Sequence, residues 1–296
     1  MLVVPAVAAL AASFGWAAGI VLAQSPARAV GAFEFTRIQL IACSAILSVI
    51  CAILGYWSTV AWENWLAYAA SIGIGILLGK LAMIECLRRG GPRRTELLLA
   101  LKAPLVAVMA FVWMGETISA PGLIGGAVIL SGVVLAICFA GPAAKESDPV
   151  DGSLGVVIVL GIGAAACQGA GYSLMKPVLL AGTEPLAVSA ARLTGAAFLI
   201  SIIALWPNGA FRSDTEMTPG LLFRIILPGF IGYGVSSSLL LYAFANLNAG
   251  MAAILGSLSP VLVLPLIKLQ TGVAPHGFAW AGAVLAIAGT SLMIFY

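Results

Sequence analysis

The segment LLLALKAPLVAVMAFVWMGE (residues 97–116) is an apolar run long enough to cross a lipid bilayer, and it carries a lysine near its middle. Lys102 is followed two positions later by Pro104. A lysine at the centre of a bilayer costs about 2.5–3.5 kcal/mol on insertion scales. The segment therefore predicts a membrane-spanning helix whose lysine faces a polar interior instead of lipid.

The rest of the chain has the same character. Of its 296 residues, 62% are hydrophobic and 8% are charged, and the mean hydropathy is +1.12. Soluble domains carry roughly 25% charged residues. The composition predicts an all-α, polytopic protein of a cytoplasmic membrane, which we interpret as bacterial. The net charge of +3, without a basic cluster interleaved with aromatics, argues against nucleic acid as a partner.

Few residues in the sequence suit metal or redox chemistry. The five cysteines fall in apolar segments without a CxxC pair, so we interpret them as small residues in helix packing. The single histidine, His276, lies in a short predicted loop. We therefore expect no metal site, no cofactor and no catalytic triad.

Charged residues, prolines and glycine-rich joints divide the apolar sequence into windows of about 20 residues, the length that spans a bilayer. A polar joint, GPAAKESDPVDG (141–152), separates five windows from five more. The sequence thus predicts ten transmembrane helices. They lie near 3–23, 33–57, 65–87, 95–114, 120–140, 153–176, 186–206, 221–245, 249–270 and 277–296.

Landmarks in the two halves recur at a nearly constant offset of 155 or 156 residues. Each match is weak alone, but the common shift predicts an internal repeat. The predicted units are residues 1–141 and 153–296, joined by a short linker at 142–152. The matching landmarks are Trp16 and Tyr172, Arg37 and Arg192, Pro104 and Pro260, and Gly126 and Gly282.

An odd number of spans in each copy requires the second copy to be inverted, and the charges agree. In the first half, basic residues follow the first and third spans, at Arg28 and in RRGGPRR (88–94). The counterpart loops of the second half, AGTEPLA (181–187) and NLNAG (246–250), hold no Lys or Arg. Counterpart loops exchange their charge, as the positive-inside rule requires of inverted copies. The same bias places both termini outside the cell.

Two segments resemble a known family. WMGETISAPGLIGGAVILSGVVLAI (113–137) resembles the Gly-Glu signature that closes a repeat of the EamA family, in the drug/metabolite transporter superfamily. SLMKPVLLAGTEPLAVSAARLTGAAFLI (173–200) is similar to the family's start of a repeat. The second copy departs from the pattern, because QTGVAPHG (270–277) lacks the signature glutamate.

The resemblance implies a secondary transporter that exports or exchanges small metabolites, with two inverted halves around a central cavity open alternately to each side. It also implies cytoplasmic termini, opposite to the charge bias, so orientation stays open at this point. Two other classes were weighed: an intramembrane enzyme acting on lipid-linked substrates, and a non-transporting membrane subunit. The first lacks a constellation of nucleophile, base or metal ligands. A proton as coupling ion, and a monomer or a homodimer, remain alternatives.

Two lysines are candidate ligands for a substrate. Lys80 and Lys102 lie eight residues on either side of the basic segment 88–94, which places both about 12 Å inside the same membrane surface. We expect both to face a polar cavity, where they would favour a carboxylate or a phosphate. The alternatives are an ion pair with Glu85 or Glu96, or a lysine stem that extends to the surface.

Polar and aromatic residues of four other spans complete the predicted substrate site. Gln168, Tyr172 and Lys176 share one helix face, although interhelical hydrogen bonds would explain the same pattern. The full set of expected substrate-binding residues is Lys102, Lys80, Trp16, Gln168, Tyr172, Lys176, Tyr242, Ser237, Asn246 and Ser257.

A second set is predicted to act in structure or gating. Glu34 and Arg37 have the spacing of a local ion pair, and Glu184 is a candidate partner for Arg192. Glu116 belongs to the family signature but could also cap the fifth span. The full set is Arg37, Arg192, Glu34, Glu85, Glu116, Pro104 and Pro260.

Overall fold

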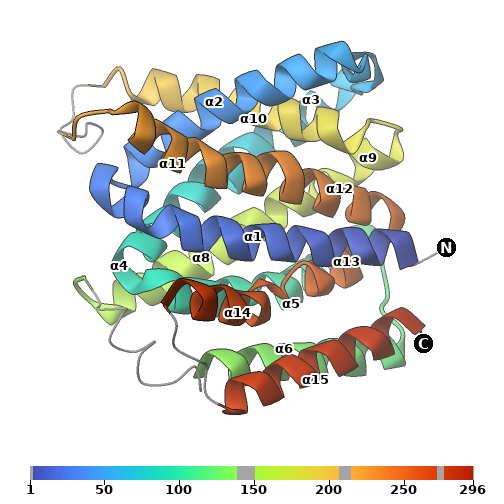
Figure 1. Ribbon diagram of the computed structural model, residues 1–296. Helices are drawn as coiled ribbons and strands as arrows, with labels where there is room; N and C mark the ends of the chain where they lie inside the picture. Colours follow the sequence, from blue (N-terminus) through green and yellow to red (C-terminus); the bar gives the residue numbers. More distant parts are fainter. Residues whose placement is uncertain (1–2, 139–150, 207–214, 272–276, 296) are drawn as a thin grey trace.

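The computed structural model describes residues 3–138, 151–206, 215–271 and 277–295, and this part of the chain consists of helices and the turns between them (Figure 1). The predicted linker falls outside the described residues apart from Asp151 and Gly152, and so does His276. The all-helical prediction is therefore confirmed for the described part of the chain.

The first half of the chain forms two long helices, then a helix that passes through 3₁₀, α and π geometry, then three more helices. These elements are α1 (Val3–Val30), α2 (Ala32–Ile53), the 3₁₀ turns η1 (Tyr56–Thr59) and η2 (Trp62–Asn64), α3 (Trp65–Ala70), the π-helix η3 (Ser71–Leu78), α4 (Gly79–Ala100), α5 (Lys102–Met114) and α6 (Ala120–Cys138).

The second half repeats this order of elements, including a π-helix inside its third long segment. These elements are α8 (Leu154–Ser173), α9 (Lys176–Leu180), α10 (Pro185–Ile203), α11 (Pro219–Gly229), the π-helix η5 (Phe230–Ser236), α12 (Ser237–Asn246), α13 (Ala249–Leu255), α14 (Ser259–Thr271) and α15 (Gly277–Phe295).

Seven helical stretches among the described residues are long and apolar enough to cross a membrane. They correspond to the predicted spans one to four and six to eight. The other three predicted spans coincide with α6, α13 with α14, and α15, and stay predictions. The seven stretches are Val3–Val30, Ala32–Ile53, Trp62–Gly91, Arg94–Met114, Leu154–Leu180, Pro185–Ile203 and Pro219–Asn246.

The predicted loop at 88–94 is instead a break at one residue. Gly91, inside the range of α4, has φ 75° and ψ 169°, which are not helical values, so the helix axis changes direction there. Glycine adopts this left-handed φ without a steric penalty. The following residue, Pro92, has the fixed φ that suits the first turn of a new helix. The chain thus reverses between the third and fourth spans with almost no loop.

Hydrogen bonds between the halves define one end of the molecule, which we call the basic end. Thr215 donates to the carbonyl of Ala29 at the end of α1 (2.8 Å). The backbone N–H of Asp151 donates to the carbonyl of Arg89 (2.9 Å). The end of α1, the kink at Gly91 within α4 and the start of α8 lie at this same end in Figure 1.

The opposite end, which we call the terminus end, carries both chain termini in Figure 1. There the N–H of Ala61 donates to Thr183 (3.0 Å), and Asn248 donates to the carbonyl of Thr117 (3.2 Å). It follows that α1 runs from the terminus end to the basic end, whereas α8 runs from the basic end to the terminus end. α1 and α8, which occupy matching positions in the two halves, are therefore antiparallel.

The two halves share their departures from regular α-helix. The π-helices η3 and η5 occupy matching segments of the two halves. The helix pair α4–α5 breaks at Leu101, and α13–α14 breaks over residues 256–258, again at matching positions. π-Helical turns and broken helices concentrate at functional sites, because they leave backbone groups free of the regular ladder.

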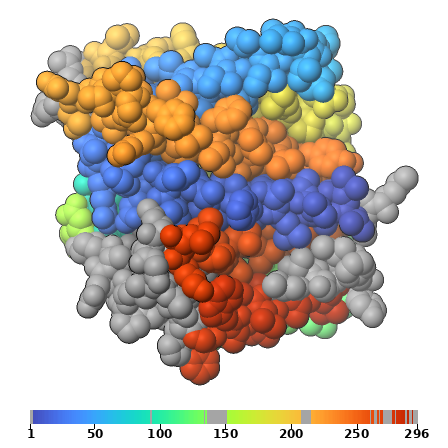
Figure 2. Space-filling view, viewed as in Figure 1, coloured from blue at the N-terminus to red at the C-terminus, as the bar shows by residue number. Residues whose placement is uncertain are grey.

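Packing also pairs matching elements of the two halves. α2 packs on α10, α5 on α13, and α6 on α15. α4 packs on α8, and the elements that match these two in the other half, η5 with α12 and α1, also pack on each other. Figure 1 shows α6 and α15 side by side at one edge. In Figure 2 the atoms of α1 lie directly against those of α11 and α12 on the face in view. The long helices of one half therefore pack on helices of the other.

One close approach between the halves joins η3 to α8 at two glycines. A Cβ atom added to Gly75 would lie 2.6 Å from the Cα of Gly171, and one added to Gly171 would lie 2.5 Å from the Cα of Gly75. Such contacts are not tolerated, so neither position accepts a side chain without displacement of backbone. Small residues at helix crossings allow this close packing in membrane proteins.

We predict that Gly75→Ala destabilises the protein, because the added methyl group forces η3 away from α8. Overpacking of this kind costs about 1–3 kcal/mol. Thermal unfolding of the purified protein in detergent measures the effect, with a melting temperature lowered by several degrees. Gly73→Ala is the matched control, since a Cβ there meets no atom within 4 Å. Equal melting temperatures for the two variants would contradict this account of the crossing.

Candidate functional site

A polar cavity lies between the two halves, close to the π-helices and the helix breaks. The space open to the centres of water-sized molecules is about 90 Å³. One water needs roughly 10–15 Å³ on that measure, so there is room for several heavy atoms. The polar and aromatic lining residues are Trp16, Gln39, Lys80, Glu96, Lys102, Gln168, Tyr172, Arg192, Tyr233, Ser237, Ser257 and Ser259.

The break between α4 and α5 positions Lys102. Pro104 has no N–H to donate to the carbonyl of Ala100, and α4 ends at that residue. Leu101 closes with a tighter bond to Leu98 (3.2 Å), and α5 begins at Lys102. The lysine is 6% exposed and lines the cavity.

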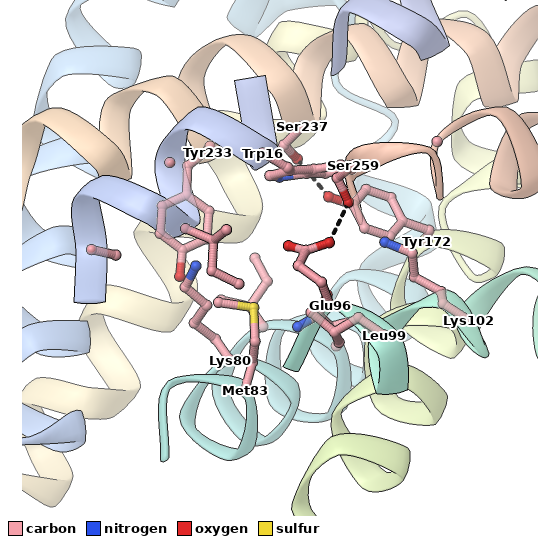
Figure 3. A pocket seen from close by; sticks show the side chains of 18 of the residues that line it. Trp16, Lys80, Met83, Glu96, Leu99, Lys102, Tyr172, Tyr233, Ser237 and Ser259 are labelled. Carbon is pink, nitrogen blue, oxygen red and sulfur yellow. Dashed lines mark hydrogen bonds between the residues drawn. The ribbon is translucent and has the colours of Figure 1, made fainter. Parts of the chain in front are cut away.

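The ammonium group of Lys102 lies over aromatic rings. Its Nζ is 4.5 Å from the ring centre of Trp16 and 5.9 Å from that of Tyr172. The two rings meet edge to face, with 6.2 Å between their centres. Trp16 and Tyr172 are the pair that the internal repeat relates, and they form one wall of the cavity beside the lysine (Figure 3).

Two further cations line the cavity in the same way. Lys80 Nζ lies 4.7 Å from the ring centre of Tyr233, and the Arg192 guanidinium carbon lies 5.0 Å from that of Tyr172. Figure 3 shows Lys80 and Tyr233 on one side of the cavity and Lys102 with Tyr172 on the other. Among the described residues, no carboxylate oxygen comes within 4.0 Å of a side-chain nitrogen of these three cations.

The energy balance leaves this group of cations incompletely compensated. A cation over an aromatic face gains about 0.5–2 kcal/mol. Removal of a charge from water costs several kcal/mol even after the protein relaxes. The difference is made up by water or by an anionic group inside the cavity.

Three polar atoms in the cavity wall have no hydrogen-bond partner in the described part of the chain. They are Gln39 Oε1, Arg192 Nε and Tyr233 Oη. Gln39 and Arg192 are 1% and 2% exposed. An unsatisfied buried polar group costs about 1–3 kcal/mol, so its retention indicates a ligand or water in the filled state.

The cavity also contains a carboxylate. Glu96 is 3% exposed, and its Oε2 accepts a hydrogen bond from the hydroxyl of Ser259 (2.5 Å). This bond joins α4 to α14 across the cavity, as Figure 3 shows. Glu96 does not form an ion pair with Lys102 within 4.0 Å, which was one of the alternatives left open by the sequence.

Four other predicted residues line the cavity, and each also makes a structural hydrogen bond. Gln168 donates to the carbonyl of Gly79 (3.2 Å), where η3 gives way to α4. Tyr172 donates to Ser237 (3.2 Å), and Ser257 donates to the carbonyl of Ala253 in its own helix (2.7 Å). Both explanations offered by the sequence, cavity lining and helix packing, therefore apply to these side chains.

Three predicted substrate ligands do not line the cavity. Lys176 is 6% exposed but forms an ion pair with Glu116 and donates to the carbonyl of Leu247 (2.8 Å). Tyr242 is 37% exposed, on the outer face of α12. Asn246 is exposed and donates to the carbonyl of Tyr242, one helical turn earlier (2.8 Å). Helical spacing alone assigned these residues to the wrong surroundings.

The residues that the sequence assigned to structure or gating lie in several different surroundings. Glu34 and Arg37 form a local ion pair (2.6 Å), in which the Arg37 side chain is partly exposed. Glu85 binds Arg88 (2.7 Å) and Arg89 outside the cavity, so it pairs with neither cavity lysine. The sequence offered Glu184 as a partner for Arg192, but no such pair forms.

Pro104 and Pro260 both belong to the first turn of the helix that follows a break, α5 and α14.

Arg192 was expected in a structural role, whereas it lines the cavity. Gln39 and Tyr233 were not among the predicted ligands. Glu96 was considered only as a partner of a lysine. A polar side chain in an otherwise apolar span was the signal for all four.

Glu116 ties three elements together at the terminus end. Beside its ion pair with Lys176, it accepts a hydrogen bond from the N–H of Ala249 at the start of α13 (2.7 Å). Lys176 reaches the carbonyl of Leu247 just before that helix. The expected cap of α6 also forms, because Ser119 Oγ accepts a hydrogen bond from the N–H of Gly122 (3.3 Å). Glu116 itself belongs to the network that joins these elements. The described residues contain no group of three His, Cys, Asp or Glu side chains that could hold a metal ion.

Taken together, the apolar helices and the central polar cavity define an integral membrane protein of the transporter type. Comparison with known families agrees. The EamA-like transporter family model matches residues 4–138 and 155–295, and the chain belongs to that family. This membership groups the chain with transporters and not with enzymes.

One curated relative is the "Probable terminal-alkyne amino-acid exporter" of Streptantibioticus cattleyicolor, 28% identical over 206 residues. The alignment covers 68% of this chain and 64% of the relative's length. A crystal structure, described only as that of a protein, has a TM-score of 0.77 at 15% identity. It covers 97% of this chain and 95% of that one, and the likeness establishes the fold alone.

We predict that Glu116→Gln destabilises the protein, because Lys176 is then buried without a carboxylate. Loss of one member of a buried pair costs about 3–5 kcal/mol. The double variant Glu116→Gln with Lys176→Met should recover most of that loss, as thermal unfolding in detergent would show.

The local pair of Glu34 with Arg37 supplies the control. The Arg37 side chain is 33% exposed and can be hydrated when its partner is lost, so Glu34→Gln should cost less than about 1 kcal/mol. If the double variant melts no higher than Glu116→Gln alone, the pair does not carry the network.

Proposed function

We propose that this protein is a secondary transporter that exports or exchanges small metabolites bearing a carboxylate, amino acids among them. Residues 1–141 and 153–296 act as two inverted five-helix repeats, which together make ten membrane spans. The repeats rock about the central cavity, which opens to one side of the membrane at a time. The antiparallel course of α1 and α8 and the paired breaks of the two halves support this arrangement.

One observation carries the choice of substrate class. Lys80, Lys102 and Arg192 are held in one cavity over aromatic faces, with no carboxylate of the described residues within 4.0 Å. A carboxylate of the substrate would supply the missing counter-charge. The aromatic rings would at the same time contact an apolar or unsaturated side chain. The relative described as an amino-acid exporter fits the same class of substrate.

The network of Glu116 and Lys176 acts as the closed gate of the terminus end. It joins the end of α8 and α9 to the start of α6 and to α13, so these elements must separate when the cavity opens there. Alternating access requires such a contact to break once in each cycle, which links the gate to the rocking of the repeats.

Counterflow in liposomes tests the proposal. Purified protein is loaded with unlabelled candidate metabolites, and uptake of labelled amino acids and other small carboxylates is measured. Lys102→Ala should lower uptake at least about tenfold, since removal of a charged partner from a buried site costs roughly 1.5–3 kcal/mol.

Lys268→Ala is the matched control, because that lysine is exposed at the end of α14. Uptake that is insensitive to Lys102→Ala would remove the lysine from the site. If no carboxylate is transported, a non-transporting membrane subunit becomes the better explanation.

The distribution of charge predicts the orientation in the membrane. The exposed Arg28 lies at the basic end and the exposed Glu63 lies at the terminus end. By the positive-inside rule, the basic end faces the cytoplasm and both termini face outward. In a background without native cysteines, a membrane-impermeant maleimide added to intact cells should label Glu63→Cys but not Arg28→Cys. The reverse pattern would place the termini in the cytoplasm.

A further inference from the structure

Glu96 is the only acidic residue among the described residues that line the cavity. It is 3% exposed, and a carboxylate so deeply buried costs several kcal/mol unless its charge is compensated. Its one hydrogen bond in the described part of the chain comes from Ser259, to Oε2. A carboxylate accepts about four hydrogen bonds, so most of its capacity remains open toward the cavity.

The cavity holds opposite charges without joining them. Coulomb attraction would draw the Lys102 ammonium to the Glu96 carboxylate, yet no pair forms within 4.0 Å. The lysine is held over Trp16 and the carboxylate is turned to Ser259, as Figure 3 shows. The cavity therefore offers a binding position for a cation, at Glu96, beside a binding position for an anion, at Lys102.

We propose that Glu96 is a specificity-determining residue that binds the ammonium group of the substrate, so that the cavity selects α-amino acids over carboxylates that lack an amine. This inference rests on the proposed function, in which the cavity cations bind the carboxylate. A zwitterion satisfies both signs of buried charge in one molecule. A simple carboxylate satisfies the cations and leaves Glu96 uncompensated.

The framework on both sides fixes the position of the carboxylate. Glu96 lies on α4, six residues and roughly 9 Å of helix rise before Lys102. Ser259 begins α14 directly after the matching break of the other half. The ammonium site is thus built from both repeats, one contributing the charge and the other the hydroxyl that orients it.

Matched pairs of substrates test the inference in liposomes. Leucine and isocaproate differ by the amine alone, and so do phenylalanine and phenylpropanoate. Each compound competes for counterflow of a labelled amino acid. Wild-type protein should prefer the amine-bearing member by roughly 10- to 100-fold, which corresponds to one charge-assisted hydrogen bond.

Glu96→Gln should reduce this preference to within about threefold and leave the binding of the amine-free member intact. Ser259→Ala should reduce it partially, and serves as the test if Glu96→Gln does not fold. Glu85→Gln is the control, since that carboxylate lies outside the cavity and should leave the preference unchanged.

The outcomes separate the two proposals. Equal binding of both members by the wild type, or an unchanged preference in both Glu96→Gln and Ser259→Ala, overturns the inference and leaves the proposed function standing. A shift in pH dependence without a change in preference identifies Glu96 as a proton site and likewise overturns it. If the wild type binds neither member of any pair, the proposed function fails, and this inference fails with it.

Discussion

The central constraint on this structure is the burial of cationic side chains for which the described chain provides no carboxylate partner. Lys80, Lys102 and Arg192 each rest on an aromatic ring, and those contacts recover only part of the cost of burial. Such an arrangement survives only if it is hydrated or periodically occupied by an anion. The helices around it are therefore organised to enclose a cavity instead of a dry core.

The backbone is adapted to the same constraint. A regular α-helix has no free carbonyl or N–H in its middle, so a polar site between helices needs interruptions. η3 and η5 supply them in one pair of matching segments, and the breaks before Lys102 and Ser259 supply them in the other. The crossing at Gly75 and Gly171 brings η3 against α8 and places Tyr172 and Arg192 within reach of each other.

The sequence predicted the helical membrane class and the repetition of landmarks, because apolar windows and a constant offset do not depend on tertiary contacts. It also placed Lys102, Lys80 and Trp16 in the cavity lining. A charged side chain or a large aromatic side chain within a membrane span has few other environments to occupy.

It misplaced Lys176 and Tyr242, and it assigned Arg192 to a structural role. In a helix that is apolar all round, no polar face marks the interior, so the direction of a side chain depends on which helices surround it. The partner of Lys176, Glu116, lies in another span, and no local spacing connects them.

The contrast between Lys176 and Lys102 separates two uses of the same side chain. Both are 6% exposed. For Lys176 the protein supplies a carboxylate and a carbonyl, which compensate its charge. If this contact is the proposed gate, Lys176 must be hydrated when the gate opens. For Lys102 the protein supplies aromatic faces and leaves the counter-charge to a ligand. A ligand that fills the cavity lowers the cost of burying Lys102 and therefore favours a closed site, whereas opening the terminus end exposes Lys176 to water. In the proposed transport cycle, occupancy of the cavity and opening of the terminus end are then linked through the hydration of two lysines: substrate would compensate Lys102, and Glu116 compensates Lys176.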